Sequence, residues 1–154
     1  MQPPQLADIF LIPLMDGDFA VGQVVNAKDT PEGTVLCILT LLKSAPDWPP
    51  SPIHYSEAIA LVLTQTASLT DGTWQTVGFE AVPALERVFD LEKAVASNFE
   101  NLTVHDPAIL EAFVNACHGL YPWDGFPDSQ FFTKLLIHPD RIPSTAKMKS
   151  QFPS

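Results

Sequence analysis

The sequence predicts an α+β protein in which a curved antiparallel sheet, or a small SH3-like β-barrel, is followed by C-terminal helices. Three observations lead to this prediction. Residues 8–25 have the pattern of a strand, a tight turn and a second strand. Short apolar segments separated by turn signals continue to residue 79 without a long helix. Strong helical signals begin only at Asp106.

Length and composition indicate one folded domain over residues 1–154. Hydrophobic residues make up 46 % of the chain and charged residues 17 %, which is typical of a chain that buries a core. We expect a β-rich part at residues 6–97, a helical third at residues 104–140 and a basic tail at residues 141–154. The tail is expected either to be disordered or to lie across the acidic body.

The opening hairpin is the clearest local signal. Ile9 to Leu14 and Phe19 to Val25 are apolar and strand-like, and Asp16-Gly17 between them favours a two-residue turn. Pro13 has no backbone N–H, so the first strand is expected to be an edge strand or to end near this residue. Gly22 predicts a bulge or a close approach of two backbone segments.

Further strand-like segments follow the hairpin. Thr34 to Leu42 is apolar without clean alternation, which predicts a strand buried on both faces. Ser44 to Pro52 is proline-rich and predicts a stiff loop, and Ala58 to Leu63 predicts another strand. Asp71-Gly72 then predicts a second hairpin turn, leading into a strand over Trp74 to Phe79 with Trp74 in the core.

Residues 83–97 fit two interpretations. A helical period is formed by Leu85, Val88, Leu91 and Val95. Arg87 to Phe89 fits a short strand equally well. The segment is therefore left between helix and strand.

The C-terminal third carries the helical signals. Asp106 is a good N-cap, Pro107 suits the first helical position, and Gly119 ends the apolar stripe. A second short helix is expected to begin at an Asp128 cap. Its buried face would consist of Phe131, Phe132, Leu135 and Leu136. Residues 120–127 between the helices predict a rigid aromatic loop.

The chain is strongly acidic. It contains eighteen Asp and Glu but only eight Lys and Arg, which gives a formal net charge of −10. No acidic residue follows Asp140, whereas Arg141, Lys147 and Lys149 lie in the tail. An acidic body repels phosphate backbones, so nucleic-acid binding is not expected, and a basic partner would be attracted. The alternative interpretation is that the charge only keeps the protein soluble.

The sequence contains no pattern typical of an enzyme. The four histidines lack metal-ligand spacing, and there is no Gly-x-Ser-x-Gly elbow, phosphate-binding glycine loop or Cys-x-x-Cys pair. Asp16 and Asp18 flank a turn, where Asp is primarily a turn former. We therefore expect no catalysis, no metal and no cofactor. A hydrolase built from scattered Asp and His stays open as an alternative, to be tested at His105 and His118.

Cysteine usage and hydropathy predict a cytoplasmic protein. Cys37 and Cys117 lie in apolar segments and are expected to be buried free thiols, although a disulfide is not excluded by the sequence. The N-terminal residues lack the pattern of a secretory signal. The longest apolar runs, Val35 to Leu42 and Ala58 to Leu63, are far shorter than the roughly 20 residues of a membrane-spanning helix.

Two landmarks resemble a known family. The first consists of Asp8 to Leu14, Asp16-Gly17, Phe19 and Gly22 to Val24. It resembles the opening of the immunity protein 26 family of bacterial polymorphic toxin systems, in which an apolar strand ending in Pro-Leu precedes a turn and an aromatic-x-x-Gly-x-Val strand. The second, Trp74 to Gly78 with Pro83, is similar to that family's Trp close before a Gly and a Pro. The resemblance covers about the first 90 residues. Ala7 replaces the usual Gly, and residues 106–138 are not matched to the family.

The resemblance implies a protein that binds and neutralises a cognate toxin domain stoichiometrically, without catalysis of its own. The acidic charge is compatible with a basic nuclease toxin, because an acidic surface can mimic the nucleic-acid backbone. From residue type and loop position we predict acidic contacts at Asp16, Asp18, Asp47, Asp124 and Asp128, with Trp48 and Trp123 as apolar anchors. The alternative function is a peptide or small-ligand binding module outside any toxin system, which genomic context would distinguish.

Overall fold

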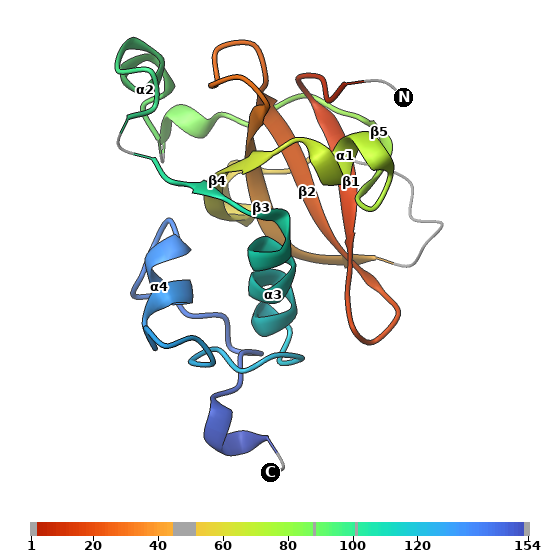
Figure 1. The fold of residues 1–154 in the computed structure, drawn as a ribbon, viewed down its shortest axis with the longest axis vertical. Helices are drawn as coiled ribbons and strands as arrows, with labels where there is room; N and C mark the ends of the chain where they lie inside the picture. The colour runs from red at the N-terminus through yellow and green to blue at the C-terminus, as the bar shows by residue number, and fades with distance from the viewer. Residues whose placement is uncertain (1–2, 45–51, 88, 101, 153–154) are drawn as a thin grey trace.

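A single six-stranded sheet forms the centre of the molecule, in the strand order β5-β1-β2-β3-β4-β6 (Figure 1). The computed structural model describes residues 3–44, 52–87, 89–100 and 102–152. All neighbouring strands are antiparallel except β4 and β6, which are parallel. The strands are β1 (Asp8–Pro13), β2 (Phe19–Asn26), β3 (Thr34–Ser44), β4 (Ala58–Gln65), β5 (Gln75–Phe79) and β6 (Val104–His105).

The sheet is open, with β5 at one edge and β6 at the other. The prediction of an antiparallel sheet is confirmed, and the alternative of a closed β-barrel is wrong. If the short strand β6 is left aside, β5 and β4 are the two outermost strands, and a closed barrel would require them to pair with each other. Instead, β4 pairs on its outer edge with β6, through Leu63 and Thr64. The chain crosses from β4 to the opposite edge of the sheet by way of helix α1 (Ala67–Asp71).

The hairpin predicted at Asp71-Gly72 is wrong. Gly72 is the C-cap of α1, with a φ of +86°, and β5 pairs with β1 rather than with β4. A left-handed glycine after Asp ends a helix as readily as it makes a hairpin turn, so the dipeptide alone does not distinguish the two. The expected core position of Trp74 is confirmed, since its side chain is fully buried.

The hairpin predicted at Asp16-Gly17 is confirmed and joins β1 to β2. β1 ends at Pro13 and lies between β5 and β2, so Pro13 marks the end of a strand and not a sheet edge. At Gly22, a Cβ atom would lie 2.6 Å from the Phe10 ring and 3.0 Å from the Ile38 carbonyl oxygen. The register to β3 also shifts at this point. Both the close approach and the bulge are therefore present.

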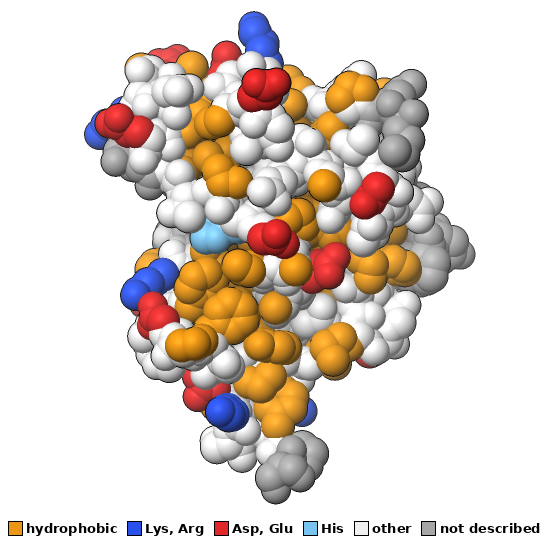
Figure 2. Space-filling model, in the orientation of Figure 1, with side chains coloured by type: hydrophobic (Ala, Val, Ile, Leu, Met, Phe, Trp, Pro, Cys, Tyr) orange, Lys and Arg blue, Asp and Glu red, His pale blue; other side chains and the backbone are white. Residues whose placement is uncertain are grey.

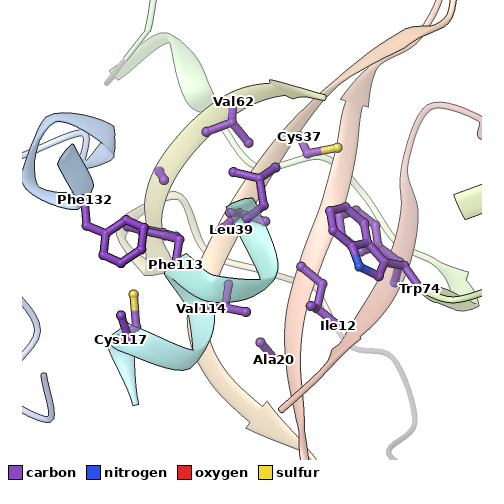
Figure 3. Packing of buried hydrophobic residues seen from close by; sticks show 14 of the residues in the cluster. Ile12, Ala20, Cys37, Leu39, Val62, Trp74, Phe113, Val114, Cys117 and Phe132 are labelled. Atoms are coloured by element: carbon purple, nitrogen blue, oxygen red, sulfur yellow. The ribbon is translucent and has the colours of Figure 1, made fainter. Parts of the chain in front are cut away.

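The sheet is buried on both faces, as the β3 sequence indicates. Val35, Cys37 and Leu39 point to one core and Leu36 and Ile38 to the other. The first core lies beneath helix α3 (Pro107–Cys117). Figure 3 shows side chains of α3 among those of the strands, and Phe132 beside Phe113. This core also includes Phe10, Ile12, Ala20, Val62, Trp74, Val114, Cys117 and Trp123.

The second core is covered by the segment that precedes β4 and the segment that follows β5. They include the 3-10 turns η1 (Tyr55–Glu57) and η2 (Leu85–Arg87) and the helix α2 (Leu91–Ala96), which Asp90 caps. The helical interpretation of residues 83–97 thus holds for residues 91–96, and Arg87 lies in a turn and not in a strand. Val88 lies outside the described residues. Ile53, Leu85 and Phe99 bring these segments onto the sheet.

The helical third contains α3 and the short helix α4 (Phe131–Leu135). Asp106 caps α3 by accepting a hydrogen bond from the Ala108 N–H. The predicted Asp128 cap of the second helix is displaced by two residues, because Gln130 is the N-cap of α4. Asp128 instead accepts from the Gln130 N–H in a turn just before the helix. Phe132 is fully buried, as expected for the inner face.

The tail lies against the loop between α3 and α4. The backbone N–H of Trp123 donates to the Lys147 carbonyl at 2.8 Å, and the Thr145 hydroxyl donates to the Cys117 carbonyl. Within the described part of the tail, residues 149–151 form the 3-10 turn η3 (Lys149–Gln151). Among the described residues, no helix is long and apolar enough to cross a membrane.

Candidate interaction surface

The acids of the first hairpin converge on one lysine. Lys43 Nζ, on β3, lies 2.5 Å from an Asp16 carboxylate oxygen and 3.7 Å from one of Asp18. The hydrogen bond from Lys43 holds the pKa of the Asp16 carboxyl below its usual range and, reciprocally, raises the pKa of Lys43. The negative charges of Asp16 and Asp18, two of the predicted contact residues, are therefore partly neutralised within the chain. Asp47 and Trp48, which the sequence also singled out, lie outside the described residues.

The other two described acids of the predicted set are also engaged within the chain. Asp124 accepts a hydrogen bond from the Lys149 N–H at 2.6 Å. Asp128 accepts from the Gln130 N–H and forms an ion pair with Lys134 at 2.7 Å, which lowers the pKa of the Asp128 carboxyl. Asp128 thus uses both carboxylate oxygens, and the structure ties each of these acids to a neighbouring segment.

Trp123 is not an exposed anchor, so that prediction is wrong. Its side chain is 2 % exposed, and its Nε1–H donates to Thr133 Oγ1 at 3.0 Å. Its ring lies 5.8 Å from that of Phe113 and 5.6 Å from that of Phe132, centroid to centroid. The aromatic loop uses Trp123 to fix itself to the core, and an indole with its donor satisfied inside the chain offers nothing to a partner.

Two of the described histidines, His105 and His118, are half-buried. Burial lowers the pKa of His118, and nearby Lys43 lowers it further while Asp16 raises it. Burial also lowers the pKa of His105, whose ring lies edge-on to Phe131 at 6.1 Å. Within the described ranges, no group of three or more His, Cys, Asp and Glu could hold a metal ion.

The two cysteines are buried free thiols, as predicted. Burial raises the pKa of both thiols well above the usual range, so both are protonated at neutral pH. A buried, protonated thiol is a poor nucleophile. Cys37 and Cys117 therefore act as small core residues.

The structure exposes a surface that the sequence did not single out, at β5, which among the described residues is the last strand on its side of the sheet. We define the β5 edge surface as Asp8, Asp71, Gln75, Thr76 and Phe79. Phe79 is 76 % exposed, and Asp8 lies directly opposite it on β1. Gln75 and Thr76 are also exposed. The available signal was the uncharged strand Gln-Thr-Val-Gly-Phe between acidic residues, but the sequence could not say which strand lies at an edge.

A groove of about 370 Å³ runs beside this edge. Its lining comes from Pro3, Pro4 and Gln5, from the end of α1 between Leu69 and Gly72, and from Asp8, Gln75 and Thr76. Asp8 and Asp71 contribute carboxylates to the groove, and its described lining residues include no Lys or Arg. Asp71 accepts a hydrogen bond from the Thr73 N–H at 2.8 Å, and the pKa of its carboxyl is lowered by its hydrogen bonds from Thr73. The groove is therefore negatively charged at neutral pH.

No protein-family model, curated protein or solved structure matches this chain.

Proposed function

We propose that this chain is a cytoplasmic immunity protein of a bacterial toxin system, which binds a basic toxin domain stoichiometrically and has no catalytic activity of its own. The proposal starts from the resemblance of the first 90 or so residues to the immunity protein 26 family. The first landmark of that resemblance forms the β1–β2 hairpin, and the second covers most of β5 together with Trp74 just before it and Pro83 after it.

The observation that carries the proposal is the unbalanced charge of the surface. Eighteen acids face eight Lys and Arg in the sequence. Among the described residues, only Asp16, Asp18 and Asp128 form ion pairs. In Figure 2, acidic side chains over the middle of the molecule have no Lys or Arg beside them, whereas the cationic side chains lie at the periphery. Such a surface speeds and strengthens association with a basic partner.

A binding role also agrees with the chemistry of the interior. The two thiols are protonated core residues, and Glu111, the acid on the inner side of α3, accepts a hydrogen bond from the Trp74 indole at 2.9 Å. His105 and His118 are neutral at neutral pH because burial lowers the pKa of each. The two thiols and Glu111 are thus committed to packing and to a local hydrogen bond.

Co-expression with the product of the adjacent gene tests the proposal. The neighbouring product alone is expected to arrest growth, and this chain is expected to restore growth and to co-purify with that product in a one-to-one complex. A variant with a core defect, Gly22→Trp, serves as the negative control because it removes the folded protein without removing charge. A harmless neighbour that forms no complex would contradict the proposal and favour the peptide-binding or ligand-binding module.

A further inference from the structure

The two edges of the sheet are not equivalent. On the β4 side, Leu63 and Thr64 pair with β6, the Ile137 N–H donates to the Ile59 carbonyl, and Ala60 forms a bridge with Leu136. On the opposite side, β5 is the terminal strand and pairs only with β1 among the described residues. The outward backbone groups of β5 are therefore the available site for one more strand.

β5 also carries few of the features by which proteins protect an exposed edge. Its residues Gln-Thr-Val-Gly-Phe include no charge and no proline. A single register shift opposite Ile9 and Phe10 interrupts its pairing with β1. Phe79, at the end of the strand, keeps 76 % of its surface exposed. An edge that is uncharged, accessible and ends in an exposed aromatic ring suits the addition of an extended segment.

The charges around the edge decide what that segment is. Asp8 lies opposite Phe79, and Asp71 lines the adjoining groove together with Asp8. A cation placed over the Phe79 ring would lie beside the Asp8 carboxylate, which combines a cation–π contact with an ion pair. A second copy of this chain would bring the same carboxylates together at the edge, so self-association is disfavoured.

We propose that β5 accepts an extended basic segment of the partner as a seventh strand, with Lys or Arg side chains directed to Phe79, Asp8 and Asp71. This inference rests on the proposed function for the identity of the partner, but the strand-addition site itself is a property of this chain. It places the principal contact at the edge of the sheet and not at the predicted acids of the hairpin and loops.

A peptide probe tests the site without the toxin. The probe is a capped octapeptide of alternating Lys and Val, titrated into the isotopically labelled full chain while backbone amide resonances and hydrogen exchange are followed. Resonance shifts and slowed exchange are expected at Gln75 to Phe79. A Glu-Val peptide and a Lys-Val peptide with two central prolines are the matched controls for charge and for backbone pairing, and neither is expected to act there. No change at β5 with millimolar Lys-Val peptide, or equal binding of the proline peptide, overturns the inference.

Paired variants separate the charge effect from any effect on folding. The double substitution D8N and D71N keeps side-chain acceptors for the Gln5 and Thr73 N–H groups and removes two charges. It is expected to weaken peptide binding about tenfold, whereas E86Q with E92Q, at exposed positions of η2 and α2, is expected to change binding less than about twofold. Equal effects of the two double variants would contradict the placement of the site.

The same measurements distinguish failure of this inference from failure of the proposed function. Peptide addition at β5 without growth rescue by the chain supports the strand-addition site and contradicts the immunity role. Growth rescue and a stable complex with unchanged exchange at residues 75–79 supports the immunity role and overturns the strand-addition site.

Discussion

The indole of Trp74 donates from Nε1 to a carboxylate oxygen of Glu111 at a distance of 2.9 Å. Trp74 immediately precedes β5 and Glu111 lies on α3, so this bond joins the edge of the sheet to the helix that covers it. On its other side, Trp74 stacks on Phe10 of β1, with ring centroids 5.5 Å apart and planes 8° from parallel. The position of β5 therefore depends on the helical third as well as on the hairpin.

Removal of the acceptor at Glu111 is expected to destabilise the protein. Glu111→Ala leaves the fully buried indole N–H of Trp74 without its partner. The expected loss is about 1–3 kcal/mol in the free energy of unfolding, measured by urea denaturation. Glu111→Gln keeps an acceptor oxygen and should lose less than half as much. Equal losses in the two variants would show that the hydrogen bond is not the stabilising contact.

Gly22 is required by the close approach of β2 to Phe10. Gly22→Ala places a methyl group 2.6 Å from the Phe10 ring and 3.0 Å from the Ile38 carbonyl oxygen. We expect a loss of about 1–3 kcal/mol in the free energy of unfolding. Combining Gly22→Ala with Phe10→Leu should give a loss smaller than the sum of the two single losses, because the shortened side chain relieves one of the two contacts. Strict additivity would mean that the ring is not the obstacle.

We expect the two half-buried histidines to make the protein less stable in mild acid. The pKa of His105 and that of His118 are lowered from the ordinary value of 6.5, so the folded state favours the neutral rings. The free energy of unfolding is therefore highest, as far as these two groups are concerned, above pH 6.5. It declines as the pH falls through that value toward the lowered pKa of the folded state. The carboxyls of Asp16, Asp71 and Asp128 have pKa values lowered from 3.8. Their protonation therefore reduces stability only in a more acidic range.

Unfolding measurements at about pH 7.5 and about pH 5.5 check this prediction. The wild type should be less stable at the lower pH, and the variant His105→Gln with His118→Gln should show a smaller difference between the two conditions. An unchanged difference in the double variant would exclude the two histidines as its cause.

Lys43 offers a test of the hairpin acids as a partner surface. Lys43→Gln releases Asp16 and Asp18 from their shared cation and should change the midpoint of thermal unfolding only slightly, because the pair is exposed. If the partner contacts the β5 edge surface, the association rate should rise modestly through the added negative charge while the dissociation rate stays constant. Stopped-flow measurement separates the two rates, and a marked fall in the dissociation rate would instead assign the contact to the hairpin.

The local elements that the sequence predicted correctly depend on neighbours within a few residues. The turn at Asp16-Gly17, the buried run of β3 and the Asp106 cap of α3 are of this kind. Apart from the Asp128 cap, which is displaced by two residues, the errors concern contacts between distant segments. Gly72 ends a helix because the chain must cross to the opposite edge of the sheet, and this crossing is not encoded in the dipeptide itself.

The predictions for the candidate surface also fail where they depend on contacts between distant segments. Residue type identifies the acids as candidate contacts but does not show which of them are already paired within the chain. Lys43, for example, meets Asp16 from a strand 27 residues away along the chain. Trp123 was selected for its loop position, yet its ring is enclosed by Phe113 and Phe132 from two helices. The β5 edge surface arises only from strand order, which no short pattern in the sequence specifies.

Isothermal titration of this chain with the purified product of the adjacent gene, at about 50 mM and about 200 mM salt, tests directly whether the acidic chain binds a basic partner. We expect a one-to-one complex whose affinity falls at least several-fold at the higher salt concentration, because screening weakens attraction between the acidic surface and a basic partner. Absence of binding, or an affinity independent of salt, would contradict the claim that this acidic protein neutralises a basic toxin domain.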